Sequence, residues 1–136
     1  MHRLICTLLT CLVAGISASQ LRAEEASGVY ELRTYTTLPG RLPALNKRFE
    51  DHTLKLFEKH GMKNIMYWTP TDDAHKDNTL IYVIYHQSPE AAKASWAAFQ
   101  EDPDWKAARD ASEKDGKILM KVESVYMKKT PYSPEK

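Results

Sequence analysis

The chain has 136 residues, and its first 23 differ in character from the rest, which leaves about 113 residues to fold. That length suits one domain with one hydrophobic core. With 43% hydrophobic and 27% charged residues, the composition excludes a disordered or fibrous protein. Without Arg3 and Arg22 of the first segment, 17 basic residues face 18 acidic ones, and a net charge of −1 argues against a nucleic-acid partner.

The first 23 residues predict a signal peptide, and therefore export to the periplasm or the cell exterior. Arg3 precedes an uncharged apolar run, Leu4 to Ile16, and small and polar residues follow up to Ala23. Cleavage is expected after Ala23, with Ser19 as the alternative, and residues 24–28 then form a short segment ahead of the domain. An uncleaved anchor is a further alternative. Every later apolar run is too short to span a membrane, so no membrane span is expected after cleavage.

The distribution of cysteine and histidine argues against a metal site. Cys6 and Cys11 both lie in the leader, so the mature chain is expected to have no disulfide, no thiolate ligand and no cysteine nucleophile. His52 and His60 are eight residues apart on a predicted helix, which is not the four-residue spacing of a helical metal pair. The acidic loop at 72–78 lacks the glycine and the distal glutamate of a calcium loop.

The mature chain is predicted to open with a strand and a helix. Val29 to Thr37 is rich in β-branched and aromatic residues and ends at a Leu-Pro-Gly sequence. A helix is expected from near Arg41 to Lys59, with Gly61 placed to terminate it. Its apolar residues recur at helical spacing, at Leu42, Leu45, Phe49, Leu56 and Phe57.

Two strands and two helices follow, and a strand closes the domain. Lys63 to Thr69 and Thr79 to His86 predict a hairpin with a long polar loop. Ser88-Pro89-Glu90 and Asp102-Pro103-Asp104 are both helix-start signals, for helices that reach about Gln100 and about Asp115. Ile118 to Met127 is the last predicted strand. The domain is therefore expected to span residues 29–128, and residues 129–136 to form a mobile tail.

This β-α-β-β-α-β order predicts an α+β, ferredoxin-like subunit with an antiparallel sheet and helices on one face. The third strand is apolar on both faces, because Leu80, Tyr82 and Ile84 alternate with Ile81, Val83 and Tyr85. Helices can cover only one of these faces. A homodimer, with two sheets stacked face to face, would cover the other.

Four sequence segments resemble the NIPSNAP family. They are the strand Tyr30-Glu31-Leu32-Arg33-Thr34-Tyr35, the turn Pro39-Gly40, Gly61 with Trp68, and Asp102-Pro103-Asp104-Trp105. The resemblance covers Val29 to Met127 and implies a dimeric α+β barrel with a space enclosed between the two sheets. The wider superfamily includes small monooxygenases, haem-handling enzymes and isomerases. Eukaryotic relatives are mitochondrial and linked to vesicle handling and mitophagy, and the export-type leader of this chain departs from that pattern.

Candidate site residues lie on the strands. If Tyr30, Leu32 and Thr34 pack on the helices, Glu31, Arg33 and Tyr35 face the barrel interior. Arg33 would there receive an anionic or carbonyl-bearing ligand, or it would form a structural ion pair with Glu31, which is the favoured interpretation.

Trp68 and His86 complete the predicted ligand set of Arg33, Tyr35, Trp68 and His86. Trp68 either lines the interior or packs in the core. His86 is either a general acid or base near the barrel mouth, or it simply hydrogen-bonds a neighbouring loop.

Two classes of function are compatible with these features. The first and preferred one is an exported homodimeric module that binds a small apolar or anionic ligand, or a protein partner, without turnover. The second is an enzyme of the small oxygenase or isomerase type, with a pocket inside the dimeric barrel. No catalytic residue set and no cofactor motif is evident in the sequence, although a haem or flavin remains compatible with an enclosed space.

Overall fold

The computed structural model describes Ser17 and residues 28–134. The predicted signal peptide, apart from Ser17, lies outside the described residues, as do residues 24–27 and the last two residues of the predicted tail. Among the described residues, no helix combines the length and apolar character that crossing a bilayer requires.

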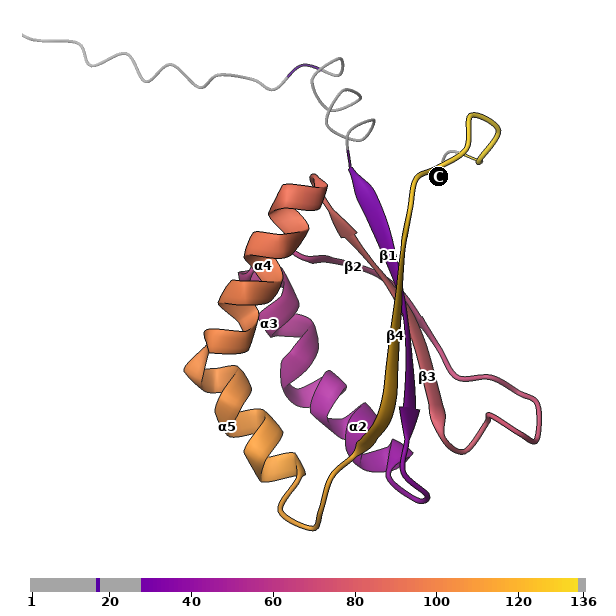
Figure 1. Cartoon of the computed structure of the whole chain (residues 1–136), viewed down its shortest axis with the longest axis vertical. Helices are drawn as coiled ribbons and strands as arrows, with labels where there is room; N and C mark the ends of the chain where they lie inside the picture. The colour runs from indigo at the N-terminus through magenta and orange to yellow at the C-terminus, as the bar shows by residue number, and fades with distance from the viewer. Residues whose placement is uncertain (1–16, 18–27, 135–136) are drawn as a thin grey trace, which may run out of the picture.

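A four-stranded antiparallel sheet forms one layer of the domain (Figure 1). Its strands are β1 (Val29–Thr37), β2 (Lys63–Trp68), β3 (Thr79–His86) and β4 (Leu119–Met127). The spatial order is β2-β3-β1-β4, so the first and third strands are central, as the predicted ferredoxin-like topology requires. The α+β fold prediction is therefore confirmed.

The helices lie together on one face of this sheet (Figure 1). They are α2 (Leu42–Arg48), η1 (Phe49–Thr53), α3 (Leu54–Lys59), α4 (Pro89–Glu101) and α5 (Pro103–Ser112). Both predicted helix starts are confirmed, because Ser88 Oγ accepts from the Ala91 amide at 3.1 Å and Asp102 Oδ1 accepts from the Asp104 amide at 2.8 Å.

The first predicted helix is continuous, but its middle turn is not α-helical. Phe49–Thr53 forms a π-helical turn, in which the Leu54 amide bonds to the Phe49 carbonyl. Thr53 Oγ1 donates to the Arg48 carbonyl at 3.1 Å and so provides a buried partner at this wider turn. A π turn holds about one residue more than an α turn and is frequent at functional sites.

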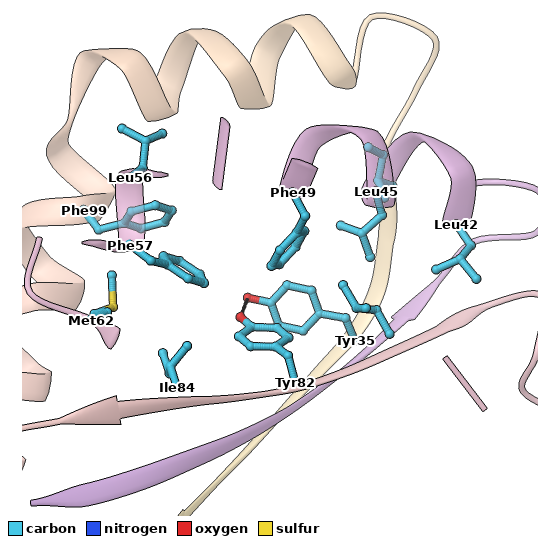
Figure 2. Close-up of a cluster of buried hydrophobic side chains, with 12 residues drawn as sticks. Tyr35, Leu42, Leu45, Phe49, Leu56, Phe57, Met62, Tyr82, Ile84 and Phe99 are labelled. Atoms are coloured by element: carbon cyan, nitrogen blue, oxygen red, sulfur yellow. Dashed lines mark hydrogen bonds between the residues drawn. The ribbon is translucent and has the colours of Figure 1, made fainter. Parts of the chain in front are cut away.

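The core fills the space between the sheet and the helices with aromatic rings (Figure 2). Tyr82 of β3 lies at its centre, with ring centroids 5.2 Å from those of Tyr35, Phe49 and Tyr67. The Tyr82 hydroxyl donates to the Tyr35 hydroxyl at 2.9 Å, which pairs two buried polar groups with each other.

The other face of the sheet is largely apolar, and no helix formed by residues 28–134 covers it. Ladder register puts Leu32 of β1 opposite Val83 of β3 and Val125 of β4, and it puts Trp68 of β2 opposite Ile81. Three large side chains of this face, Met66, Trp68 and Val125, are 41%, 48% and 55% exposed. We refer to this helix-free side as the open face.

Candidate functional site

Polar side chains gather around one buried carboxylate, that of Glu31, between the sheet and α4. Glu31 is only 1% exposed, and its two oxygens accept four side-chain hydrogen bonds. The donors are Arg33 Nη1 (2.6 Å) and Ser124 Oγ (2.7 Å) to Oε1, and His86 Nε2 (2.9 Å) and Trp96 Nε1 (2.7 Å) to Oε2. We call these five residues the Glu31 cluster. Every acceptor position that a carboxylate normally offers is used.

The hydrogen bonds keep this carboxylate ionised. Burial alone raises the pKa of Glu31, but the bonds from His86, Ser124, Trp96 and Arg33 outweigh it and lower the pKa to about 2. At neutral pH Glu31 is therefore a fixed negative charge, paired with the Arg33 guanidinium. It is not available as a general acid.

The orientation predicted for Glu31, Arg33 and Tyr35 is wrong. These residues face the helices, not the open face, and Tyr35 packs in the core against Phe49. The Arg33 guanidinium lies 4.3 Å from the ring centroid of Trp96, which α4 supplies. The ion pair and the cation–π contact together offset the desolvation of the charges. Among residues 28–134, no helix covers the open face to supply such partners there.

The four predicted ligand residues do not share one space. Arg33, Tyr35 and His86 lie on the helix side of the sheet, whereas Trp68 lies on the open face. His86 is not at a barrel mouth, because its side chain is fully buried and its Nε2 bonds to Glu31. Its Nδ1 is buried without a hydrogen-bond partner.

An open cleft lies beside the Glu31 cluster, between the first turns of α4 and the end of β4. Its volume is about 480 Å³, and it is lined by Val29, Pro89, Lys93 and Tyr126. The Tyr126 ring lies 6.2 Å from that of His86 and so stands between the cleft and the cluster. Burial and the nearby Glu31 charge raise the pKa of Tyr126, which keeps its phenol neutral.

Sequence reasoning missed the partners that Glu31 receives from distant segments. Trp96 and Ser124 are 65 and 93 residues away along the chain. One weak signal for these partners lies in β4, where a small polar residue, Ser124, pairs in register with Arg33.

The other predicted polar residues have structural roles. His60 Nε2 donates to Asp102 Oδ2 at 2.6 Å, so this histidine supports the N-terminal cap of α5. His75 Nδ1 bonds to Asp72 at 2.7 Å within the exposed hairpin loop. Within Ser17 and residues 28–134, no group of three or more His, Cys, Asp or Glu side chains is arranged to hold a metal ion.

Sheet order, helices on one face and a buried polar cluster beneath α4 define a ferredoxin-like α+β domain. The family model of NIPSNAP matches residues 30–134. The chain belongs to the NIPSNAP family.

Solved structures share this fold. A NIPSNAP family protein of unknown function from Agrobacterium tumefaciens is 23% identical, with 80% of this chain and 94% of that chain covered and a TM-score of 0.66. A NIPSNAP-like domain protein from Burkholderia xenovorans is 14% identical, with 81% and 91% covered and a TM-score of 0.68. SnoaB, a cofactor-independent oxygenase from Streptomyces nogalater, is 14% identical, with 81% and 100% covered and a TM-score of 0.54. A search of curated proteins finds no match.

Proposed function

We propose that the chain acts as a homodimer in which each subunit binds a small apolar or anionic ligand and releases it unchanged. The observation that carries this proposal is the saturation of Glu31. The one buried carboxylate of the cluster holds four hydrogen bonds and stays ionised, while an apolar cleft remains open beside it. The polar groups of the Glu31 cluster are thus held by one another, and the cleft beside them has room for a ligand.

The open face supports the homodimer. Met66 and Trp68 of β2 and Val125 of β4 are exposed, so the apolar surface reaches both edge strands of the sheet. Monomeric proteins rarely expose apolar patches beyond a few hundred Å². A second copy related by a two-fold axis offers the same apolar surface in return.

Dimerisation through the open face would leave the cleft accessible, because the cleft lies on the opposite side of the sheet. Val29 alternates with Tyr30 along β1 and faces the helices. Val29 and Pro89 supply apolar lining, and Lys93 supplies a positive charge at the rim. These groups suit a compact apolar molecule with one acidic group.

The alternative function is an enzyme of the oxygenase or isomerase type. SnoaB carries an oxygenase activity on this fold, but a fold alone does not transfer a reaction. Proton transfer to a bound molecule would need His86, whose side chain is fully enclosed behind Tyr126. The fixed cluster therefore favours binding over turnover.

The dimer is tested by Trp68→Glu. A tryptophan side chain buries up to about 250 Å², so 48% exposure leaves about 120 Å² for a partner to cover. At about 25 cal/mol per Å² that is about 3 kcal/mol in each subunit, of which only part appears as affinity. We expect light scattering to show a dimer for the wild type and at least a ~100-fold weaker dimer for Trp68→Glu.

The matched control is Tyr132→Glu, which makes the same kind of change at an aromatic residue that is 85% exposed outside the sheet. It should leave the dimer intact. A wild-type protein that stays monomeric at micromolar concentration would refute the homodimer.

The ligand site is tested with 8-anilinonaphthalene-1-sulfonate, whose apolar rings and single sulfonate match the cleft. Lys93→Gln should weaken its fluorescence-detected binding about tenfold, since it removes the charge at the rim. Lys117→Gln, at an exposed lysine outside the cleft, should not. Equal binding by both variants, or none by the wild type, would contradict the proposed site. Conversion of a copurified ligand, followed by mass spectrometry and visible absorbance, would instead support the enzyme.

Export is part of the proposal and has its own test. The full chain expressed in a bacterial host should yield a mature protein that starts at Glu24, or at Gln20 if Ser19 is the cleavage point. Intact-mass measurement reads this directly. A protein that retains Met1 and stays in the cytoplasm would contradict export.

A further inference from the structure

A second groove runs along the helical layer, between α5 and the continuous helix formed by α2, η1 and α3. It consists of two adjoining hollows of about 260 and 510 Å³, which share Asp51, His52, Ala108 and Ala111. This groove lies between helices, whereas the cleft at Lys93 lies between α4 and β4. The two sites have no lining residue in common.

Small side chains keep the groove open. Ala44 of α2 and Ala108 and Ala111 of α5 line it where larger side chains would fill the space between the helices. The lining is mainly apolar, so an occupant would bury a hydrocarbon body there.

An incompletely paired arginine lies at one end of this apolar lining. Arg48 lines the groove, is only 4% exposed, and its Nε is buried with no hydrogen-bond partner. Nη1 donates to Ser112 Oγ at 3.2 Å, the Glu113 carboxylate forms an ion pair at 3.7 Å, and the guanidinium lies 5.1 Å from the ring centroid of Trp105. An arginine has five N–H donors, and buried charges normally use them fully.

The other charges around the groove do not compensate for Arg48. Asp51 forms an ion pair with Lys47 at 2.8 Å, and Asp104 lies 3.4 Å from Lys59. Burial lowers the pKa of Arg48 by more than the Glu113 carboxylate, 3.7 Å away, raises it. Arg48 therefore adds a buried, only partly neutralised positive charge to the lining of the groove.

The π turn places residues at this same groove. Asp51 and His52, which line both hollows, belong to η1, where the helix is widened. Because π turns are rare and are frequent at functional sites, this turn is an observation independent of Arg48.

We propose that this groove binds a carboxylic acid with an elongated apolar body, whose carboxylate pairs with Arg48 and whose chain lies over Ala108 and Ala111. A guanidinium offers parallel donors that match the two oxygens of a carboxylate. The alanines provide the apolar contact. This site is additional to the cleft at Lys93 and does not depend on it.

The experiment titrates decanoate into the mature protein and measures binding by calorimetry. The groove lies within one subunit, so the test does not depend on whether the protein is a dimer. Ala111→Leu fills the groove with a residue that suits an exposed helix position, and it should weaken decanoate binding at least tenfold. Ala98→Leu makes the same change on the exposed side of α4, outside the groove, and should leave the affinity unchanged. Decan-1-ol, which has the same chain without the charge, should bind at least tenfold more weakly.

Two further variants separate this site from the others. Arg48→Lys keeps the charge but removes Nε, and it should weaken decanoate binding while decan-1-ol binding stays the same. Lys117→Gln, at an exposed lysine outside both sites, should leave decanoate affinity unchanged. Failure of the α4–β4 cleft would appear in the binding of 8-anilinonaphthalene-1-sulfonate by Lys93→Gln, and failure of this groove in the binding of decanoate by Ala111→Leu, so the two failures are distinguishable. Absence of decanoate binding, equal binding by Ala111→Leu, or equal affinity for decan-1-ol would overturn the proposal.

Discussion

The buried carboxylate Glu31 makes a quantitative prediction about acid stability. Its pKa falls from 4.5 to about 2 in the folded protein. A lowered folded-state pKa contributes stability that is fully present above about pH 4.5 and is lost as the pH falls towards 2. A shift of about 2.5 units corresponds to about 3 kcal/mol, of which about 2 kcal/mol is already lost at pH 3.

The perturbation is Glu31→Gln, which has a similar shape and cannot ionise. The amide also places two donors against the donors of Arg33, Ser124, His86 and Trp96, so the variant should be less stable than the wild type at pH 7. Because only the wild type carries the titrating group, the difference in free energy of unfolding should shrink by about 2 kcal/mol between pH 7 and pH 3.

Urea denaturation at several pH values, followed by tryptophan fluorescence, measures this difference. Glu50→Gln is the control, because Glu50 is exposed on η1 and outside the Glu31 cluster. Its unfolding free energy should run parallel to that of the wild type. If the Glu31→Gln curve is also parallel to the wild type from pH 7 to pH 3, the account of the cluster as an ionised, hydrogen-bonded centre is wrong.

Two further predictions concern the helix ends. Asp102→Ala should lower the free energy of unfolding at neutral pH by about 2 kcal/mol, since it removes the cap of α5 and the partner of His60 and Lys59. That loss should be measured by thermal melting and should shrink in acid, because bonds from Lys59 and His60 hold the pKa of Asp102 well below its usual range. Gly61→Ala should cost about 1 kcal/mol in urea denaturation, because its φ of +75° disfavours a Cβ while the nearest atom, Ser95 Oγ, is 3.8 Å away. An unchanged unfolding midpoint would show that this turn can relax.

Local sequence signals were sufficient to predict the fold. Strand alternation, the two Ser/Asp-Pro helix starts and the terminating Gly61 all act within a few residues, and each is present in the structure. The π turn was not predictable, because the apolar residues from Leu42 to Phe57 also fit a regular helix.

Local signals could not predict which set of β1 side chains faces the helices. Burying the charged Glu31 and Arg33 costs more desolvation free energy than burying Tyr30 and Leu32. The sequence of the strand alone therefore favours the wrong orientation. The charges become acceptable only when Trp96 and Ser124 approach from distant segments. Such long-range partners leave no local periodicity in the sequence.

The widened turn at Phe49–Thr53 has a consequence for how this domain tolerates change in length. A π turn is geometrically an α-helical turn that holds one extra residue. The helical segments on either side of it therefore still present the same faces to the sheet. A chain shortened by one exposed position here, such as Glu50, could regain regular winding and still bring Leu45 and Phe57 to the core. Such a shortened chain would retain the architecture while altering the contour beside Arg48. The surplus residue therefore serves the surface of the domain rather than its interior.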